Sequence, residues 1–216
     1  MWRFGTDELM LKEQGNGSRP PSRARVLIAG LIGNVMEWYD FALYGYFATI
    51  IGHQFFPSSN PTASLIGAFG AFAAGFIVRP LGGIVYGRIG DLVGRRRALS
   101  LSVIAMAIPT VAMAFLPTHA QIGIAAPIAV VLLRLLQGVS AGGEYTTSII
   151  FLAEAAPDRQ RGFYSIWGLW GSVLGMLMGS AFGDLLTRTL TQTQLDAWGW
   201  RVAFALGSLV ALSGVI

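Results

Sequence analysis

Long apolar stretches separated by short polar connectors are the main pattern along the 216-residue chain. The stretches run over residues 26–51, 62–86, 98–116, 124–155, 163–183 and 200–216. A helix needs roughly 20 apolar residues to cross the hydrocarbon core of a bilayer. The pattern therefore predicts an all-α integral membrane protein with six transmembrane helices, whose boundaries are set to within several residues.

Composition favours a membrane protein over a water-soluble one. Hydrophobic residues make up 54% of the chain and charged residues 12%, about half the ~25% of soluble globular domains, and the mean hydropathy is +0.59. So few charges leave a soluble fold unable to cover its surface. Residues 1–25 are polar, mixed in charge and unlike a secretory signal peptide, so we expect them to form a flexible cytoplasmic tail.

Lysine and arginine are concentrated on alternate connectors. Eleven of the fifteen lie in the tail and in connectors 87–97 and 157–162, whereas the other side holds Arg188 and Arg201. The positive-inside rule then places the amino terminus in the cytoplasm of a multi-pass protein of the inner (plasma) membrane. The sixth span ends at Ile216 with no basic residue after it, which indicates a truncated helix.

The sequence carries no pattern typical of an enzyme. It has no Cys, no Ser/His/Asp set, no metal-ligand spacing, and no P-loop or dinucleotide glycine fingerprint. His53 and His119 fall in separate connectors, so we expect neither a metal nor a cofactor. The basic residues follow the topology instead of gathering on one soluble face, so we expect lipid and not nucleic acid as a partner.

The connector after the second span carries a spaced motif, G-x-x-x-D-x-x-G-R-R, formed by Gly87, Asp91, Gly94, Arg95 and Arg96. The positive-inside rule explains the arginines but not the spaced aspartate and glycines. The motif resembles the signature loop of the major facilitator superfamily. In that family the glycines allow a tight turn and the charges hold two six-helix halves together, so the resemblance implies a role in conformational gating.

Five further strings resemble the metabolite:proton symporter branch of this superfamily, whose members carry dicarboxylates, citrate, shikimate, or zwitterionic osmolytes such as proline and betaine. The strings are GNVMEWYDF at 33–41, RPLGG at 79–83, RLLQGVSAGGEY at 134–145, PDRQRGFYS at 157–165 and WGWRVAF at 198–204. The resemblance implies that residues 26–216 form the N-terminal six-helix half of a twelve-helix fold. The C-terminal half would then be a partner that this chain lacks.

Ionisable residues inside the spans are the candidates for transport chemistry. Each costs at least ~2.5 to 3.5 kcal/mol near the bilayer centre on insertion scales, so each requires a partner or a watery cavity. With a rise of ~1.5 Å per residue, Glu37 lies roughly 16 Å deep, Asp40 roughly 21 Å and Arg134 roughly 15 Å. We expect these three to meet near the middle of the membrane.

Helical spacing adds other polar residues to the same faces, and the predicted substrate and proton-coupling residues are Asn34, Glu37, Asp40, Tyr44, Arg134 and Gln137. We expect Arg134 to pair with Glu37 or Asp40 in the empty protein and with an anionic solute group in the loaded one, because arginine binds carboxylates bidentately. Protonation of the carboxylate would then release Arg134 and couple proton to solute. The alternative is a fixed ion pair that locks two helices together.

Three residues nearer the cytoplasmic ends of their spans have two interpretations each. Arg79, which precedes Pro80, either takes part in gating or extends its charge to the membrane interface. Glu144 and Tyr145 either make polar contacts at an inner gate or anchor a loop.

The fifth span carries a stripe of small residues, Gly171, Gly175, Gly179 and Gly183, at every fourth position. Such a stripe lets another helix approach closely. The resemblance implies that it meets helices of the absent half, and the alternative is contact within the six helices present.

The sequence thus predicts proton-coupled symport of a small organic anion such as a di- or tricarboxylate. The alternatives are a proton symporter of zwitterionic osmolytes such as proline and betaine, or a truncated fragment that does not transport.

Overall fold

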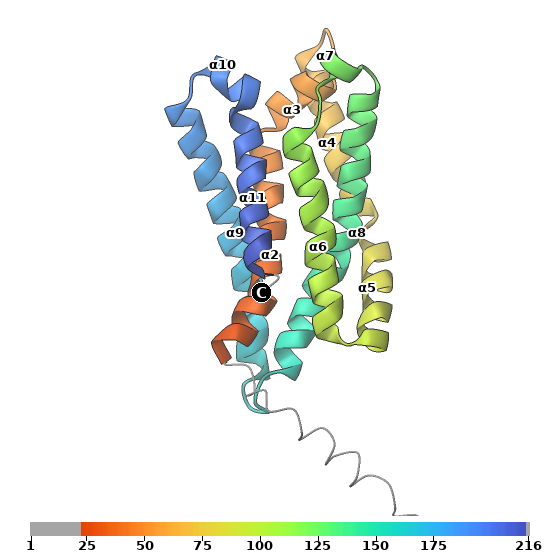
Figure 1. The fold of residues 1–216 in the computed structure, drawn as a ribbon, viewed down its shortest axis with the longest axis vertical. Coiled ribbons are helices and arrows are strands. Elements are labelled where there is room, and N and C mark those ends of the chain that lie inside the picture. The colour runs from red at the N-terminus through yellow and green to blue at the C-terminus, as the bar shows by residue number, and fades with distance from the viewer. Residues whose placement is uncertain (1–22, 215–216) are drawn as a thin grey trace, which may run out of the picture.

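The computed structural model describes residues 23–214, which form an elongated bundle of helices with no strand in that range (Figure 1). Of the predicted tail over residues 1–25, residues 1–22 lie outside the described part, as do the last two residues of the chain, whereas residues 23–25 already belong to the first helix. The elements in chain order are α2 (Arg23–Tyr46), α3 (Ala48–Phe55), α4 (Pro61–Ile77), α5 (Arg79–Val93), α6 (Arg95–Phe115), α7 (His119–Ile122), α8 (Ala125–Glu154), α9 (Arg161–Thr189), α10 (Gln192–Gln194), the π-helical turn η1 (Leu195–Gly199) and α11 (Trp200–Gly214).

The long helices run alternately up and down the bundle, as the colour gradient in Figure 1 shows. Helix α2 continues into α3, and α4 continues into α5 across a break at Val78. Among the described residues, four helical stretches are long and apolar enough to cross a membrane: Pro61–Val93, Arg97–Phe115, Ala125–Glu154 and Arg161–Thr189. The α2–α3 rod and α11 lie alongside them and follow the first and sixth predicted spans.

Helices extend further than the apolar stretches predicted. The predicted connector 87–97 is almost entirely helical, because α5 continues to Val93 and α6 begins at Arg95. Gly94 alone makes the turn, with φ +95° and ψ 147°, a conformation that only glycine adopts readily. Likewise α9 continues to Thr189 and not 183, since polar residues end a hydrophobic span but do not end a helix.

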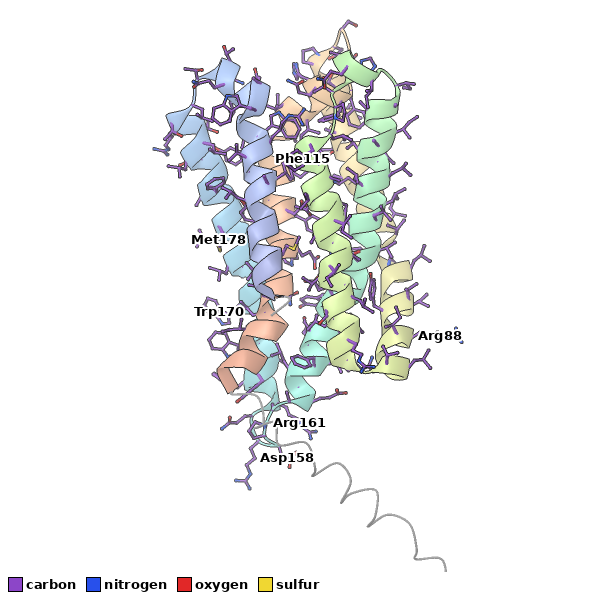
Figure 2. The ribbon with its side chains drawn as sticks, in the orientation of Figure 1. Arg88, Phe115, Asp158, Arg161, Trp170 and Met178 are labelled. Carbon is purple, nitrogen blue, oxygen red and sulfur yellow. The ribbon has the colours of Figure 1, made fainter. Side chains whose placement is uncertain are left out.

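Aromatic packing closes one end of the bundle. Trp200 and Phe204 of α11 are fully buried, and the Trp200 ring meets the Phe55 ring of α3 edge-on at 5.7 Å between centroids. Large apolar side chains elsewhere point outward, among them Trp170 and Met178 of α9 (Figure 2). An outward apolar surface of this kind suits contact with lipid or with further membrane helices.

The glycine stripe of α9 packs against α2. A β-carbon at Gly175 would collide with the backbone carbonyl of Val35, and one at Gly179 would come within 2.7 Å of the Tyr39 carbonyl. Gly171 meets the Leu31 carbonyl of α2 in the same way, and Gly183 meets the ring of Tyr46 at the end of α2. The expectation that this stripe meets helices of an absent half is therefore wrong, because the close approach of α2 already fills it.

Candidate functional site

Five ionisable side chains gather where α2, α5 and α8 meet. Glu37 and Asp40 come from α2, Arg79 from the first turn of α5, and Arg134 and Glu144 from α8. All except Arg79 are at most 2% exposed. Charged residues buried inside a membrane span are costly and mark functional sites, so this cluster is the candidate transport site.

The deeper of two ion pairs joins α2 to α8. Arg134 donates from Nη1 to Oδ2 of Asp40 at 2.6 Å, and Gln137 donates from Nε2 to Oδ1 of Asp40 at 3.1 Å. Both oxygens of Asp40 are therefore occupied. The structure thus brings together three of the residues that the sequence predicts for coupling.

Two further residues hold this pair in place. The guanidinium of Arg134 stacks on the ring of Tyr44, 4.0 Å from its centroid, and the Tyr44 hydroxyl donates to the Ala68 carbonyl. Gln137 Nε2 also donates to the hydroxyl of Thr110 on α6 at 2.8 Å. Sequence reasoning missed Thr110, since a threonine in an apolar span gives no signal until its neighbour across the bundle is known.

The second ion pair joins α2 to α5. Arg79 donates from Nη2 to Oε1 of Glu37 at 2.7 Å, and its guanidinium lies over the rings of Phe41 and Phe76, 4.6 and 4.1 Å from their centroids. The sequence places Arg79 nearer the cytoplasmic end of its span. In the structure it lies in the first turn of α5, just after the turn at Val78, and from there it reaches Glu37.

A cleft of about 520 Å³ opens beside this second pair. It is lined by Glu37, Trp38, Phe76, Arg79, Pro80, Gly83, Ala141, Gly142, Tyr145 and Thr146. Sites for small molecules are typically concave and mostly apolar, with a few placed polar groups. The cleft fits that description, with one ion pair on its wall, and Arg134 is not among the residues that line it.

Two predicted site residues on α2 and α8 take no part in the two ion pairs. Asn34 donates from Nδ2 to the Ser148 hydroxyl at 2.7 Å and to the Gly30 carbonyl at 3.3 Å. Glu144 is 1% exposed and neither of its oxygens has a hydrogen-bond partner, whereas the next residue, Tyr145, is 39% exposed beside the cleft.

The spaced motif forms a compact structure at the end of the bundle where α5 meets α6. Arg95 bonds Asp91 at 2.6 Å and donates to the Gly87 carbonyl at 3.4 Å, across the turn at Gly94. The side chain of Arg96 lies outside the described residues. Arg88 points outward, and the α8–α9 connector with Asp158 and Arg161 lies at the same end of the bundle (Figure 2).

Metal-binding groups are not found in the described part of the chain, where no cluster of three or more His, Cys, Asp or Glu side chains is placed to hold an ion. His53 lies in a separate small cleft of about 170 Å³ with Asp196, at the α3 end of the bundle.

Comparison with known proteins identifies the family. A family model described as "Sugar (and other) transporter" matches residues 26–216. The glycine betaine/proline/ectoine/pipecolic acid transporter OusA of Dickeya dadantii is 40% identical over 88% of this chain, and the alpha-ketoglutarate permease of Escherichia coli is 39% identical over 88%. The chain spans only 38% and 44% of those two relatives.

Solved structures agree on the fold. The xylose transporter XylE from E. coli superposes with a TM-score of 0.79 at 20% identity, over 88% of this chain and 46% of that one. XylE is described as a proton:xylose symporter of the major facilitator superfamily. The predicted resemblance and fold class are confirmed. This chain therefore belongs to the sugar (and other) transporter family of the major facilitator superfamily, a family of transporters and not of enzymes.

Proposed function

We propose that this chain is the proton-handling half of a secondary active transporter that moves a small carboxylate-bearing solute together with protons. A carboxylate is common to organic anions such as di- and tricarboxylates and to zwitterions such as proline and betaine. The names of the relatives include both kinds of solute. Because the chain spans less than half the length of these relatives, the remaining half would complete the solute site.

The observation that carries the proposal is the Glu37–Arg79 pair on the wall of the cleft. Arg79 uses Nη2 for Glu37, while its Nε has no partner. A guanidinium binds carboxylates through two parallel hydrogen bonds, so a solute carboxylate competes with Glu37 for Arg79. A proton on Glu37 removes its charge and weakens its ion pair with Arg79, so proton binding favours solute binding.

The Asp40–Arg134 pair is a second, deeper coupling element in this proposal. Arg134 is 2% exposed, and its Nε and Nη2 have no partner. A proton on Asp40 would free the guanidinium for an anionic group that reaches it in another conformation. If the pair is instead a fixed lock, replacing both charges by Asp40→Asn with Arg134→Gln leaves transport intact.

A zwitterion is the second candidate solute, and the aromatic lining of the cleft favours it. Trp38, Phe76 and Tyr145 line the cleft beside Glu37. Aromatic rings bind quaternary ammonium groups through cation–π attraction. A betaine could therefore place its carboxylate on Arg79 and its ammonium group among these rings.

The orientation in the membrane follows from the charges. The basic connectors at the Gly94 turn and at Asp158–Arg161 lie at the end of the bundle where α2 begins. Since basic loops stay in the cytoplasm, we place this end inside the cell and the bundle in the inner (plasma) membrane.

The test is uptake into membrane vesicles with an inward proton gradient, using the full-length protein and the 216-residue chain side by side. The panel contains a labelled dicarboxylate, a tricarboxylate, proline and betaine. We expect the full-length protein to accumulate one of these solute classes, Arg79→Gln to abolish that uptake, and the exposed control Arg88→Gln to keep it. Uptake by Arg79→Gln at the wild-type level, or no accumulation of any panel member, would refute the proposal.

A further inference from the structure

Glu144 of α8 is a buried carboxyl that the proposed function leaves without a role. Its side chain is 1% exposed, and neither Oε1 nor Oε2 has a hydrogen-bond partner. Oε1 lies against the α-carbon of Gly33 on α2, where any β-carbon would collide with it. Gly33 therefore leaves room for this carboxyl, one helical turn before Glu37 on the same helix face.

Two charged residues from neighbouring helices act on Glu144. Glu37 of α2 and Arg79 of α5 both interact with it electrostatically. On the α6 side the neighbour at Gly33 is the apolar Val103, and Tyr86 of α5 packs on the residue that precedes Glu144. Arg79 is already bonded to Glu37 at 2.7 Å. Two buried carboxyls thus share one cation.

Charge balance within this group decides where a proton resides. If both carboxyls are ionised beside one guanidinium, a net negative charge remains on a group whose two carboxyls are each 1% exposed, and burying such a charge without a donor is strongly unfavourable. One proton makes the group neutral. Glu37 keeps its bond to Arg79, whereas Glu144 has neither a cation nor a donor of its own. The proton therefore belongs on Glu144.

We propose that Glu144 holds the transported proton in this state and passes it to Glu37 during the transport cycle. This inference rests on the proposed function and adds the group that stores the proton. In the transfer, the O–H bond of Glu144 breaks and a new one forms at Oε2 of Glu37, which has no hydrogen-bond partner. Arg79 leaves the neutral Glu37 and balances the carboxylate of Glu144.

The second step restores Glu144 and loads the solute. A proton from the aqueous phase binds Glu144, and Arg79 is then free for the carboxylate of the solute in the cleft. Both carboxyls are now neutral, and the guanidinium is balanced by the solute. One proton enters for each carboxylate bound, so the group is neutral before and after loading.

The first measurement is infrared spectroscopy of the 216-residue chain in lipid nanodiscs, which does not require transport. We expect one protonated-carboxyl C=O band of the wild-type protein to be lost in Glu144→Gln and kept, with a shift in position, in Glu144→Asp. The matched control is Glu154→Gln, because Glu154 is exposed on the same helix. An unchanged band in Glu144→Gln would overturn the inference.

The second measurement is transport by the full-length protein in vesicles. We expect Glu144→Gln to keep solute exchange at equal pH but to lose accumulation driven by a proton gradient, and Glu144→Asp to restore accumulation with a shifted pH profile. Gradient-driven accumulation by Glu144→Gln at the wild-type level would overturn the relay. If the wild-type protein itself shows no proton-driven uptake, the proposed function fails, and the relay built on it fails too, whatever the infrared result.

Discussion

Removing the charge of Asp40 should destabilise the bundle strongly, because it leaves Arg134 as a buried cation. Arg134 is 2% exposed, and Asp40 supplies the acceptor for its Nη1 at 2.6 Å while Nε and Nη2 have no partner. Breaking a buried pair by removing one partner typically costs 3–5 kcal/mol. In Asp40→Asn an amide oxygen remains as an acceptor and the Tyr44 ring still faces the guanidinium, so we expect a cost of about 3 kcal/mol, the lower end of that range.

The assay is reversible unfolding in mixed micelles, measured as the free energy of unfolding of the 216-residue chain. The double variant Asp40→Asn with Arg134→Gln should recover at least half of the loss, since neither charge is then buried alone. The matched control is Asp184→Asn, which breaks the exposed pair with Arg188 and should leave stability unchanged. A loss below ~1 kcal/mol in Asp40→Asn, or a double variant as unstable as the sum of the single ones, would refute the reasoning.

Three further predictions concern the glycines and the spaced motif. Gly175→Ala pushes α9 away from the backbone of α2 and should cost about 1–3 kcal/mol of unfolding free energy, whereas Gly162→Ala, which meets nothing within 4 Å on the same helix, should cost nothing. Gly94→Ala forces a side chain into positive φ and should cost about 1–3 kcal/mol of unfolding free energy. Its control is Gly87→Ala, because a β-carbon at Gly87 meets nothing within 4 Å. Equal stability of the two variants would contradict this prediction. Asp91→Asn should slow uptake by the full-length protein and leave the unfolding free energy of the chain unchanged, because Asp91 is 65% exposed.

The sequence predicted those features that depend on a single helix, namely where the spans lie and how deep each residue lies in its span. The lengths of the apolar stretches predict the spans, and the similar depths of Asp40 and Arg134 predict that they meet. Span length and residue depth both follow from the helical rise per residue. Counting along the chain could not name the partner of Arg79, because that depends on the turn at Val78 and on the neighbouring helix that carries Glu37. Glu37 forms its ion pair with Arg79, and among the described residues Arg134 forms its ion pair with Asp40 alone.

The sequence did not show which helices pack side by side. A stripe of glycines shows that some helix comes close but not which one, and α2 turned out to be the partner of α9. In the same way Gly33 has no special meaning on its own, and its role becomes clear only when Glu144 of α8 is seen against it. Polar residues around Asp91 suggested a loop, yet helix α5 continues through them to Val93.

The most direct test of the central claim is to measure proton and solute movement together in vesicles that hold the full-length protein. Addition of the transported solute should cause a proton influx in step with solute uptake for the wild-type protein. Glu37→Gln should abolish this proton influx while solute exchange at equal pH continues, because the solute no longer competes for Arg79 with a carboxylate whose charge depends on a proton. Solute uptake without proton influx in the wild-type protein, or an unaltered proton influx in Glu37→Gln, would contradict the account.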